Sequence, residues 1–157
     1  MLIGIPAILG PALLSTLRAM GHGDEIAIVD GNYPAAEQAR RLIPADGHGV
    51  LDLLGAILSV LPIDRDVPDP VVRPGWGNDP ALAAPIHLAI DRAVAARVPG
   101  LCVAPVTGPD FYARVRAAHV VVATSEPALY GNVILRKGVI ASTGTPDVVR
   151  LTAGVTA

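Results

Sequence analysis

The sequence predicts an α/β fold, a single layered domain in which helices flank a mainly parallel sheet. Apolar runs of strand length alternate along the chain with longer segments whose apolar residues recur at helical spacing, and this order is typical of strand, helix, strand units. The 157 residues are 52% hydrophobic and 17% charged. This composition suits one compact domain with a sizeable core and excludes intrinsic disorder.

The first part of the chain predicts four elements. A helix over residues 11–22 begins at a proline, which is favoured at the first helical position. A continuous run of Ile, Ala and Val at 26–29 ends at Asp30 and is typical of a strand buried on both faces. A short helix over 35–41 follows, and then a long helix over 50–61 that a proline ends.

Residues 64–80 predict a long loop with at most a short strand at 71–72, because this stretch holds four of the fifteen prolines. Beyond it we expect a helix, a buried strand, a helix and two strands, over residues 82–98, 101–106, from 109, 119–124 and 133–135. Helical and strand signals then fade. We therefore expect one domain over 1–141 and a weakly ordered tail over 142–157.

Charge and cysteine content argue against several classes of protein. The formal net charge is -2 and no basic run is present, so nucleic acid is not an expected partner. No apolar run reaches the roughly 18 residues of a membrane span, so we expect no membrane partner. The single cysteine, Cys102, is interpreted as a small buried hydrophobe in a reducing compartment. The N-terminus is uncharged and broken by glycines and prolines, unlike a secretory signal, so we expect a cytoplasmic protein.

His22 and Asp30 are the first candidate site residues. His22 lies between two glycines, which leave open space for a ligand, and histidine can give and take a proton near neutral pH. The alternative is a solvated histidine at a helix C-terminus. Asp30 lies at the carboxyl end of a strand, where α/β sheets bind ligands, or else it caps its loop as an Asx turn. These two residues lie at opposite ends of one strand, so they share a site only if loops fold back or a neighbouring subunit supplies one of them.

Tyr130, Gly131 and Asn132 form a second polar cluster, just before the last predicted strand. Asparagine offers a donor and an acceptor together, and tyrosine offers a hydroxyl on an apolar ring, a combination that suits a sugar. The alternative is a tight turn with Gly131 at a positive φ angle.

No metal ion or other cofactor is expected. His48 could join His22 and Asp24 as metal ligands, but no short-spaced ligand motif is present. His87, on a predicted helix, and His119, at the start of a predicted strand, are interpreted as structural.

Five segments of the chain together carry a family resemblance. They are GHGDEI (21–26), DGNYPA (30–35), ADG (45–47), TSE (124–126) and YGNVILRKGV (130–139). In this order they resemble the RbsD/FucU family of sugar mutarotases and pyranases, and the match runs from about residue 2 to residue 140. Glu25 and Gly131 resemble the fucose mutarotase branch more than the ribose pyranase branch, which tends to have Ala in place of Gly131.

The resemblance implies an RbsD-like fold and a role for each candidate residue. His22 matches the family's catalytic histidine, Asp30 matches a substrate-contacting carboxylate, and Tyr130, Gly131 and Asn132 match the segment that contacts the sugar. Family members are closed homo-oligomers, commonly rings, with active sites at subunit contacts, and a decamer is one candidate assembly. Such an assembly could relieve the separation of His22 from Asp30.

The implied activity is that of an isomerase, a mutarotase or pyranase that interconverts anomers or ring forms of a fucose-like or ribose-like monosaccharide. Ring opening needs a proton to leave the anomeric hydroxyl and another to reach the ring oxygen. We expect His22 to donate to the ring oxygen while Asp30 and residues 130–132 orient hydroxyls. Two alternatives stay open: a non-catalytic monosaccharide-binding accessory protein of sugar uptake or regulation, and a protein whose apolar surface serves only assembly.

The chain departs from the fucose branch at Gly108, where that branch usually has an arginine. A charge-assisted hydrogen bond to one sugar hydroxyl should therefore be missing. The resemblance then implies a weak preference for fucose, unless Arg73 or Arg114 substitutes for the missing side chain.

Overall fold

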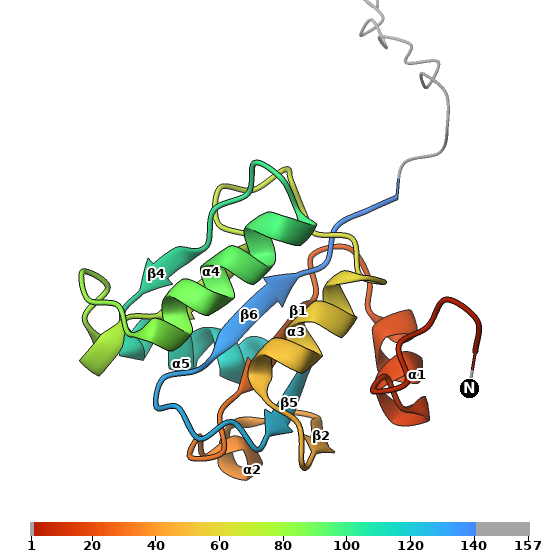
Figure 1. Cartoon of the computed structure of the whole chain (residues 1–157), viewed down its shortest axis with the longest axis horizontal. Helices are drawn as coiled ribbons and strands as arrows, with labels where there is room; N and C mark the ends of the chain where they lie inside the picture. The colour runs from red at the N-terminus through yellow and green to blue at the C-terminus, as the bar shows by residue number, and fades with distance from the viewer. Residues whose placement is uncertain (1, 141–157) are drawn as a thin grey trace, which may run out of the picture.

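A computed structural model of the chain describes residues 2–140 (Figure 1). It contains a six-stranded sheet in the order β2-β5-β1-β6-β3-β4. The strands are β1 (Glu25–Val29), β2 (Leu42–Ala45), β3 (Val71–Pro74), β4 (Ala104–Val106), β5 (Val120–Thr124) and β6 (Val133–Arg136). All neighbours pair in parallel except β6, which is antiparallel to both β1 and β3. The mainly parallel sheet that the sequence predicts is confirmed, whereas the predicted tail over 142–157 lies outside the described residues.

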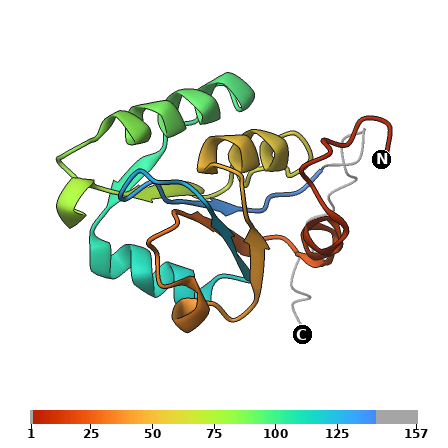
Figure 2. The same cartoon turned by 60° about the horizontal axis from the view of Figure 1, so that its bottom comes forward.

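Helices cover both faces of this sheet, as Figure 2 shows with the sheet seen nearly edge-on. The helices are α1 (Pro11–Ala19), α2 (Ala35–Gln38), α3 (Val50–Leu58), α4 (Pro85–Arg97) and α5 (Gly108–Ala117), with a single 3₁₀ turn, η1 (Trp76–Asn78). Helices α1, α3 and α4 pack on one face, and α2 and α5 pack on the other. Within residues 2–140, every helix is too short or too polar to cross a bilayer.

Alternating side chains of the central strands fill the two apolar layers. In β1, Ile26 and Ile28 join the cluster under α1, α3 and α4, while Ala27 and Val29 join the cluster under α5. Successive residues of a strand point to opposite faces, so a strand covered on both sides needs apolar residues throughout. The continuous apolar run at 26–29 is therefore explained, and its predicted burial is confirmed.

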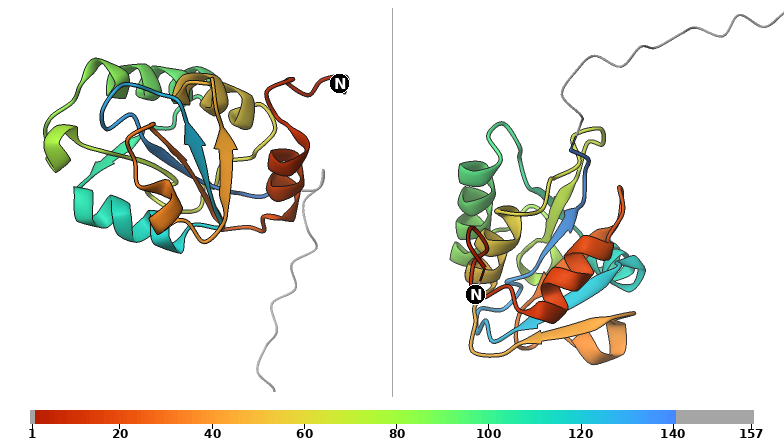
Figure 3. Two further views of the ribbon diagram at one scale, coloured as in Figure 1. Left: turned by 90° about the horizontal axis from the view of Figure 1, so that it is seen from below. Right: turned by 90° about the vertical axis from the view of Figure 1, so that its right-hand side faces the viewer.

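The two edge strands and β3 correct the sequence prediction. The chain at 42–45 forms β2, which pairs with β5 (Figure 3, left) and was not expected as a strand. Strand β3 extends through Pro74 and is buried along its whole length, because β6 and β4 flank it. Strand β4 is shorter and only partly buried. Prolines interrupt the strand pattern in all three places, and they are tolerated at sheet edges and strand ends.

Cys102 and the helix ends give further corrections. Cys102 precedes β4 and is exposed, so its interpretation as a buried hydrophobe is wrong. Helix α1 ends at Ala19, not at His22, because Met20 takes an extended backbone conformation. The Lys137 side chain donates hydrogen bonds to the carbonyl oxygens of Leu17 and Met20, a favourable position for a cation at a helix C-terminus. His22 therefore belongs to a loop between α1 and β1.

The packing of β6 predicts a large loss of stability on truncation of Ile134, which is 0% exposed. Ile134→Ala should lower the free energy of unfolding by about 2–5 kcal/mol, because the close-packed surroundings can only partly fill the cavity. Urea-induced unfolding measures this change. Leu88→Ala is the control: Leu88 is 50% exposed on α4, and a change of about 0.5 kcal/mol or less is expected there. Equal losses in the two variants would contradict the description of the core.

Candidate functional site

A cavity of about 230 Å³ lies at the end of the sheet where the parallel strands have their carboxyl ends. Its wall comes from residues that follow β1, β3 and β4 and from the residues just before β6. Because β6 runs against its neighbours, its first residues meet the carboxyl ends of the parallel strands. Four aromatic residues, Tyr33, Phe111, Tyr112 and Tyr130, line the cavity. Aromatic surface with a few polar groups is typical of a small-molecule site.

Asp30 and Asn132 form the polar centre of this cavity, and each is 5% exposed. The Asn132 side chain accepts the Asp30 backbone N–H at 2.7 Å and donates to Asp30 Oδ2 at 2.9 Å. Asp30 Oδ1 accepts the backbone N–H of Asn32 at 2.8 Å. The Asx hydrogen bond expected as an alternative for Asp30 therefore exists together with a place in the cavity wall. Such a buried carboxylate is held in one orientation by its donors.

Tyr130 and Gly131 have a different geometry from the one predicted. Tyr130, not Gly131, has the positive φ angle, at 60°. A Cβ atom on Gly131 would lie 2.9 Å from the Ala128 carbonyl oxygen and 3.2 Å from Ile86 Cγ1. Glycine is therefore needed for close packing and not for backbone conformation. The Tyr130 ring lines the cavity and meets the Trp76 ring edge to face, with the centroids 5.2 Å apart.

His87 holds the Tyr130 backbone from behind. It is 0% exposed on α4. Its Nδ1 accepts the Ala84 backbone N–H at 3.0 Å, so its Nε2 carries the proton and donates to the Tyr130 carbonyl oxygen, also at 3.0 Å. Burial lowers the pKa of His87 below its ordinary value. The structural interpretation of His87 agrees with this neutral, doubly bonded ring, and the residue also supports an unusual backbone conformation in the cavity wall.

Tyr33 contributes a hydroxyl with no partner among the described residues. Its ring stacks on Tyr112 with centroids 5.0 Å apart and meets Phe111 edge to face. The hydroxyl group is buried and forms no hydrogen bond with the described residues. Burial raises the pKa of Tyr33, so the phenol stays protonated.

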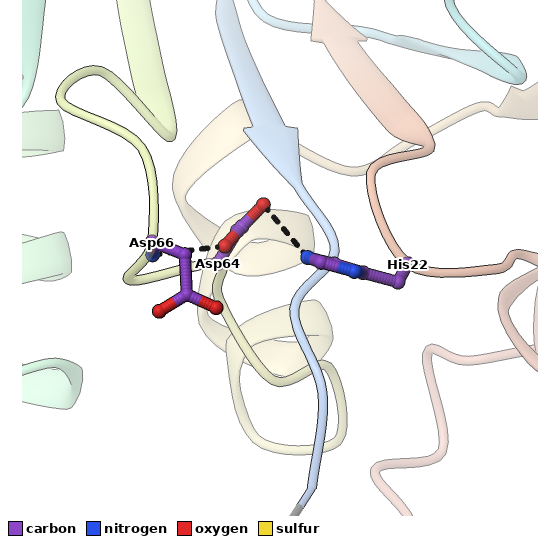
Figure 4. Close-up of side chains that lie close together, drawn as sticks. All are labelled: His22, Asp64 and Asp66. Carbon is purple, nitrogen blue, oxygen red and sulfur yellow. Dashed lines mark hydrogen bonds and ion pairs between the residues drawn. The ribbon is translucent and has the colours of Figure 1, made fainter. Parts of the chain in front are cut away.

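His22 lies away from this cavity, in the loop that precedes β1. Its side chain is 49% exposed, and its Nε2 lies 3.1 Å from Asp64 Oδ2 (Figure 4). Gly23 has a φ of 86°, and a Cβ atom there would lie 2.9 Å from Arg136 Nη2. The Gly23 N–H also donates to the Lys137 carbonyl oxygen at 2.8 Å. Glycine at this position therefore lets the loop fold tightly against the end of β6.

Asp64 is the group that holds the His22 ring, and sequence analysis missed it. It is 2% exposed, its Oδ1 accepts the Asp66 backbone N–H at 3.0 Å, and its Oδ2 accepts Arg136 Nε at 2.9 Å. These two donors hold the pKa of Asp64 below its ordinary value, with His22 adding to the effect. Asp64 is therefore a carboxylate, suited to orient the imidazole.

His22, Asp64 and Asp66 form the one group within the described residues whose ligand atoms could hold a metal ion. Atoms of His22, Asp64 and Asp66 lie within 4.8 Å of one another (Figure 4). His48 and Asp24 do not belong to this group, so the alternative cluster considered from the sequence is wrong. The Asp64 oxygen nearest to His22 is already paired with Arg136. A cation would compete with that guanidinium, so the arrangement fits an ion-pair network better than a metal centre.

The cavity and the His22 cluster occupy opposite ends of β1. Asp30 directly follows the last residue of β1, and His22 lies three residues before the first residue of that strand. The five residues of β1 separate them by roughly 16 Å at the usual rise of a strand. No loop folds back between residues 2 and 140 to bring His22 into the cavity wall. The separation predicted from the sequence is confirmed.

Comparison with known proteins places this fold and these motifs in a family. The sequence profile of the RbsD / FucU transport protein family matches residues 3–140. The chain belongs to the RbsD/FucU family. The human protein named fucose mutarotase is 40% identical over 145 residues, which cover 88% of this chain and 94% of that protein. The L-fucose mutarotase of Haemophilus influenzae is 38% identical over 143 residues, which cover 88% of this chain and 97% of that protein.

A solved structure of an RbsD/FucU relative supports the architecture. The fucose mutarotase of Streptococcus pneumoniae in complex with L-fucose matches with a TM-score of 0.82 and 37% identity, over 89% of this chain and 100% of that one. The RbsD-like fold implied by the sequence motifs is thus confirmed.

Neither arginine considered as a substitute at Gly108 reaches the cavity of this RbsD/FucU protein. Arg73 forms two hydrogen bonds with Asp91, at 2.8 and 2.9 Å. Arg114 pairs with Glu25. Neither side chain lines the cavity, so neither takes the place of the arginine that is missing at Gly108.

His87 predicts how stability depends on pH. Because burial lowers the folded-state pKa, the unfolded chain binds a proton that the folded chain does not, between the ordinary value of 6.5 and the lowered value. The free energy of unfolding should therefore fall as the pH drops below about 6.5. Urea titrations over about pH 5 to pH 8 should show a shallower fall for His87→Gln than for the wild-type protein. Identical profiles for the two proteins would contradict a buried neutral His87.

Proposed function

We propose that this protein is a sugar mutarotase or pyranase, which opens and closes the ring of a fucose-like or ribose-like monosaccharide and so interconverts its anomers. The observation that carries the proposal is the buried Asp30–Asn132 pair in an aromatic-lined cavity, in a chain whose relatives are named fucose mutarotase. The cavity volume of about 230 Å³ is below the roughly 300–1,000 Å³ of sites for drug-sized ligands. It therefore suits a single sugar ring.

Asp30 and the segment Tyr130–Asn132 bind and orient the sugar in this proposal. Asp30 keeps lone pairs on both carboxylate oxygens after accepting from Asn32 and Asn132, so it can accept hydrogen bonds from sugar hydroxyls. The Tyr130 ring offers an apolar face and a hydroxyl. Gly131 allows the segment to pack closely enough for Tyr130 and Asn132 to face the same cavity.

His22 is the proposed proton donor to the ring oxygen. Its Nε2 faces Asp64, so Nδ1 is the ring nitrogen that can reach a substrate. In its protonated form the imidazole donates from Nδ1, and it recovers its proton when the ring closes on the other face. Asp30 or a water molecule takes the proton of the anomeric hydroxyl while His22 gives a proton to the ring oxygen, so the two transfers balance within each ring opening. The chemistry needs no metal and no other cofactor.

A neighbouring subunit supplies His22 in this proposal. The separation of roughly 16 Å along β1 excludes proton transfer between His22 and a sugar on Asp30 of the same chain. His22 is 49% exposed, so it is available to a partner. A closed homo-oligomer, with a ring of ten subunits as one candidate, would repeat the same contact at every interface.

Location in the cytoplasm stays a prediction from the sequence.

His22→Ala should slow anomer exchange by about 10²- to 10⁴-fold, the usual contribution of a positioned proton donor. Saturation transfer between the α and β NMR signals of L-fucose, D-ribose and D-galactose measures the exchange. The melting temperature should change little, because the side chain is half exposed. Chelation of divalent ions should leave the wild-type rate unchanged.

His48→Ala is the matched control, since His48 is also exposed and also lies between two glycines. It should exchange anomers at the wild-type rate. If His22→Ala retains full exchange while binding sugar, His22 is structural. A wild-type protein that binds a monosaccharide without speeding exchange is instead a non-catalytic binding protein.

Mixed oligomers test whether two chains form the site. His22→Ala and Asp30→Asn should each exchange anomers slowly when alone, because every interface then lacks one group. When the two variants assemble together at equal amounts, about a quarter of the interfaces should combine an intact His22 with an intact Asp30. Anomer exchange should therefore return in the mixture. No recovery, or a monomeric mass in light scattering at micromolar concentration, would contradict a site shared between subunits.

A further inference from the structure

The turn that follows β3 brings Asn78 to the rim of the cavity. A Cβ atom on Gly75 would lie 1.8 Å from the Asp79 carbonyl oxygen, so the chain closes tightly on itself here and only glycine fits. The Asn78 N–H donates to the Gly75 carbonyl oxygen at 3.1 Å, and the Asp79 N–H donates to Trp76 at 3.1 Å. Asn78 has a φ of 68°, a conformation that asparagine tolerates better than most residues. These backbone hydrogen bonds therefore fix the position of the Asn78 backbone, from which its side chain extends.

The Asn78 side chain lies directly over Gly108, the first residue of α5. A Cβ atom on Gly108 would lie 2.2 Å from Asn78 Oδ1, 2.4 Å from Cγ and 2.8 Å from Cβ. Gly108 has no positive φ angle, so its backbone alone does not require glycine. The close contact with Asn78 is what requires glycine at position 108, so the two residues are sterically matched.

Asn78 also faces the substrate side of this contact. It lines the same cavity as Asp30 and Asn132, and it is exposed. Among the described residues that line the cavity, Asp30 is the one with a carboxylate, and none is Lys, Arg or His. Hydrogen-bond donors to a sugar must therefore be neutral on this wall. The Asn78 amide offers two donors and one acceptor group at a fixed place.

We propose that Asn78 is a specificity-determining residue, which hydrogen-bonds one sugar hydroxyl, and that Gly108 is required to seat it. This inference rests on the proposed binding of a monosaccharide in the cavity. A neutral amide gives a modest preference for sugars that present a hydroxyl at that wall over analogues that lack it. The preference should amount to about 2- to 10-fold, the range of one neutral hydrogen bond.

Asn78→Gly removes the amide and keeps the backbone conformation, because glycine readily adopts a positive φ angle. Affinities for L-fucose, D-ribose, D-galactose and their monodeoxy derivatives are measured by calorimetry for this variant and the wild-type protein. The preferred sugar should bind about 2- to 10-fold more weakly to the variant, and one deoxy analogue should bind equally to both proteins. Equal losses for every sugar, or no loss for any, would overturn the role of Asn78.

Gly108→Ala tests the steric match independently. The added methyl group should displace the Asn78 side chain and reproduce the changed ranking of sugars, and combining it with Asn78→Gly should add no further loss. Gly10→Ala is the matched control, because Gly10 also precedes a proline at a helix start and a Cβ atom there meets nothing within 4 Å. An unchanged ranking in Gly108→Ala would also overturn the proposal.

Binding and exchange separate this inference from the proposed function. If the sugar ranking changes as expected but the wild-type protein does not speed anomer exchange, Asn78 keeps its role and the mutarotase assignment fails. If exchange is fast and the ranking is unchanged, only the role of Asn78 fails. A wild-type protein that binds none of these sugars would overturn both.

Discussion

Strand β6 runs against both of its neighbours, and this reversal gives two buried carboxylates their partners. At the start of the strand, Asn132 holds Asp30 in the cavity wall. At its end, Arg136 holds Asp64, which in turn orients His22. In a fully parallel sheet, the first residue of that strand would lie at the opposite edge from Asp30, and the pairing would be lost. The antiparallel register between β1 and β6 is therefore the constraint on which both clusters depend.

The same register also explains why neither cluster can move toward the other. Both strands are central and buried on both faces, and protein interiors are close-packed. Side chains at the two ends are fixed to a rigid layer whose length is set by the strands. Loops next to each cluster are tightened further by close glycine contacts at Gly23, Gly131 and Gly138, where a Cβ atom would meet its neighbours at 2.9, 2.9 and 2.6 Å. The chain is thus built to hold two separate groups at a constant distance.

Much of the fold could be predicted from the sequence, because the buried strands are continuous apolar runs and helix starts are marked by proline. The position of Asp30 at a strand end followed directly from such a run. Strand β2 contains Pro44, and strand β3 ends at Pro74. Because proline interrupts the strand pattern, β2 was not predicted and β3 was predicted as too short. The role of Asp64 could not be predicted, because it depends on a bridge between Ile63 and Lys137 that joins distant parts of the chain.

Prolines at the two edges of the sheet limit how copies of this chain can associate. Strand β2 carries Pro44 and strand β4 carries Pro105, and these are the outermost strands. Proline has no N–H to offer to an incoming strand, which is one way proteins prevent edge-to-edge pairing. Contacts between copies would then form through side chains and loops, and not by extending one sheet into the next. In the proposed oligomer, each subunit could separate from its neighbours without breaking a continuous ladder of backbone hydrogen bonds.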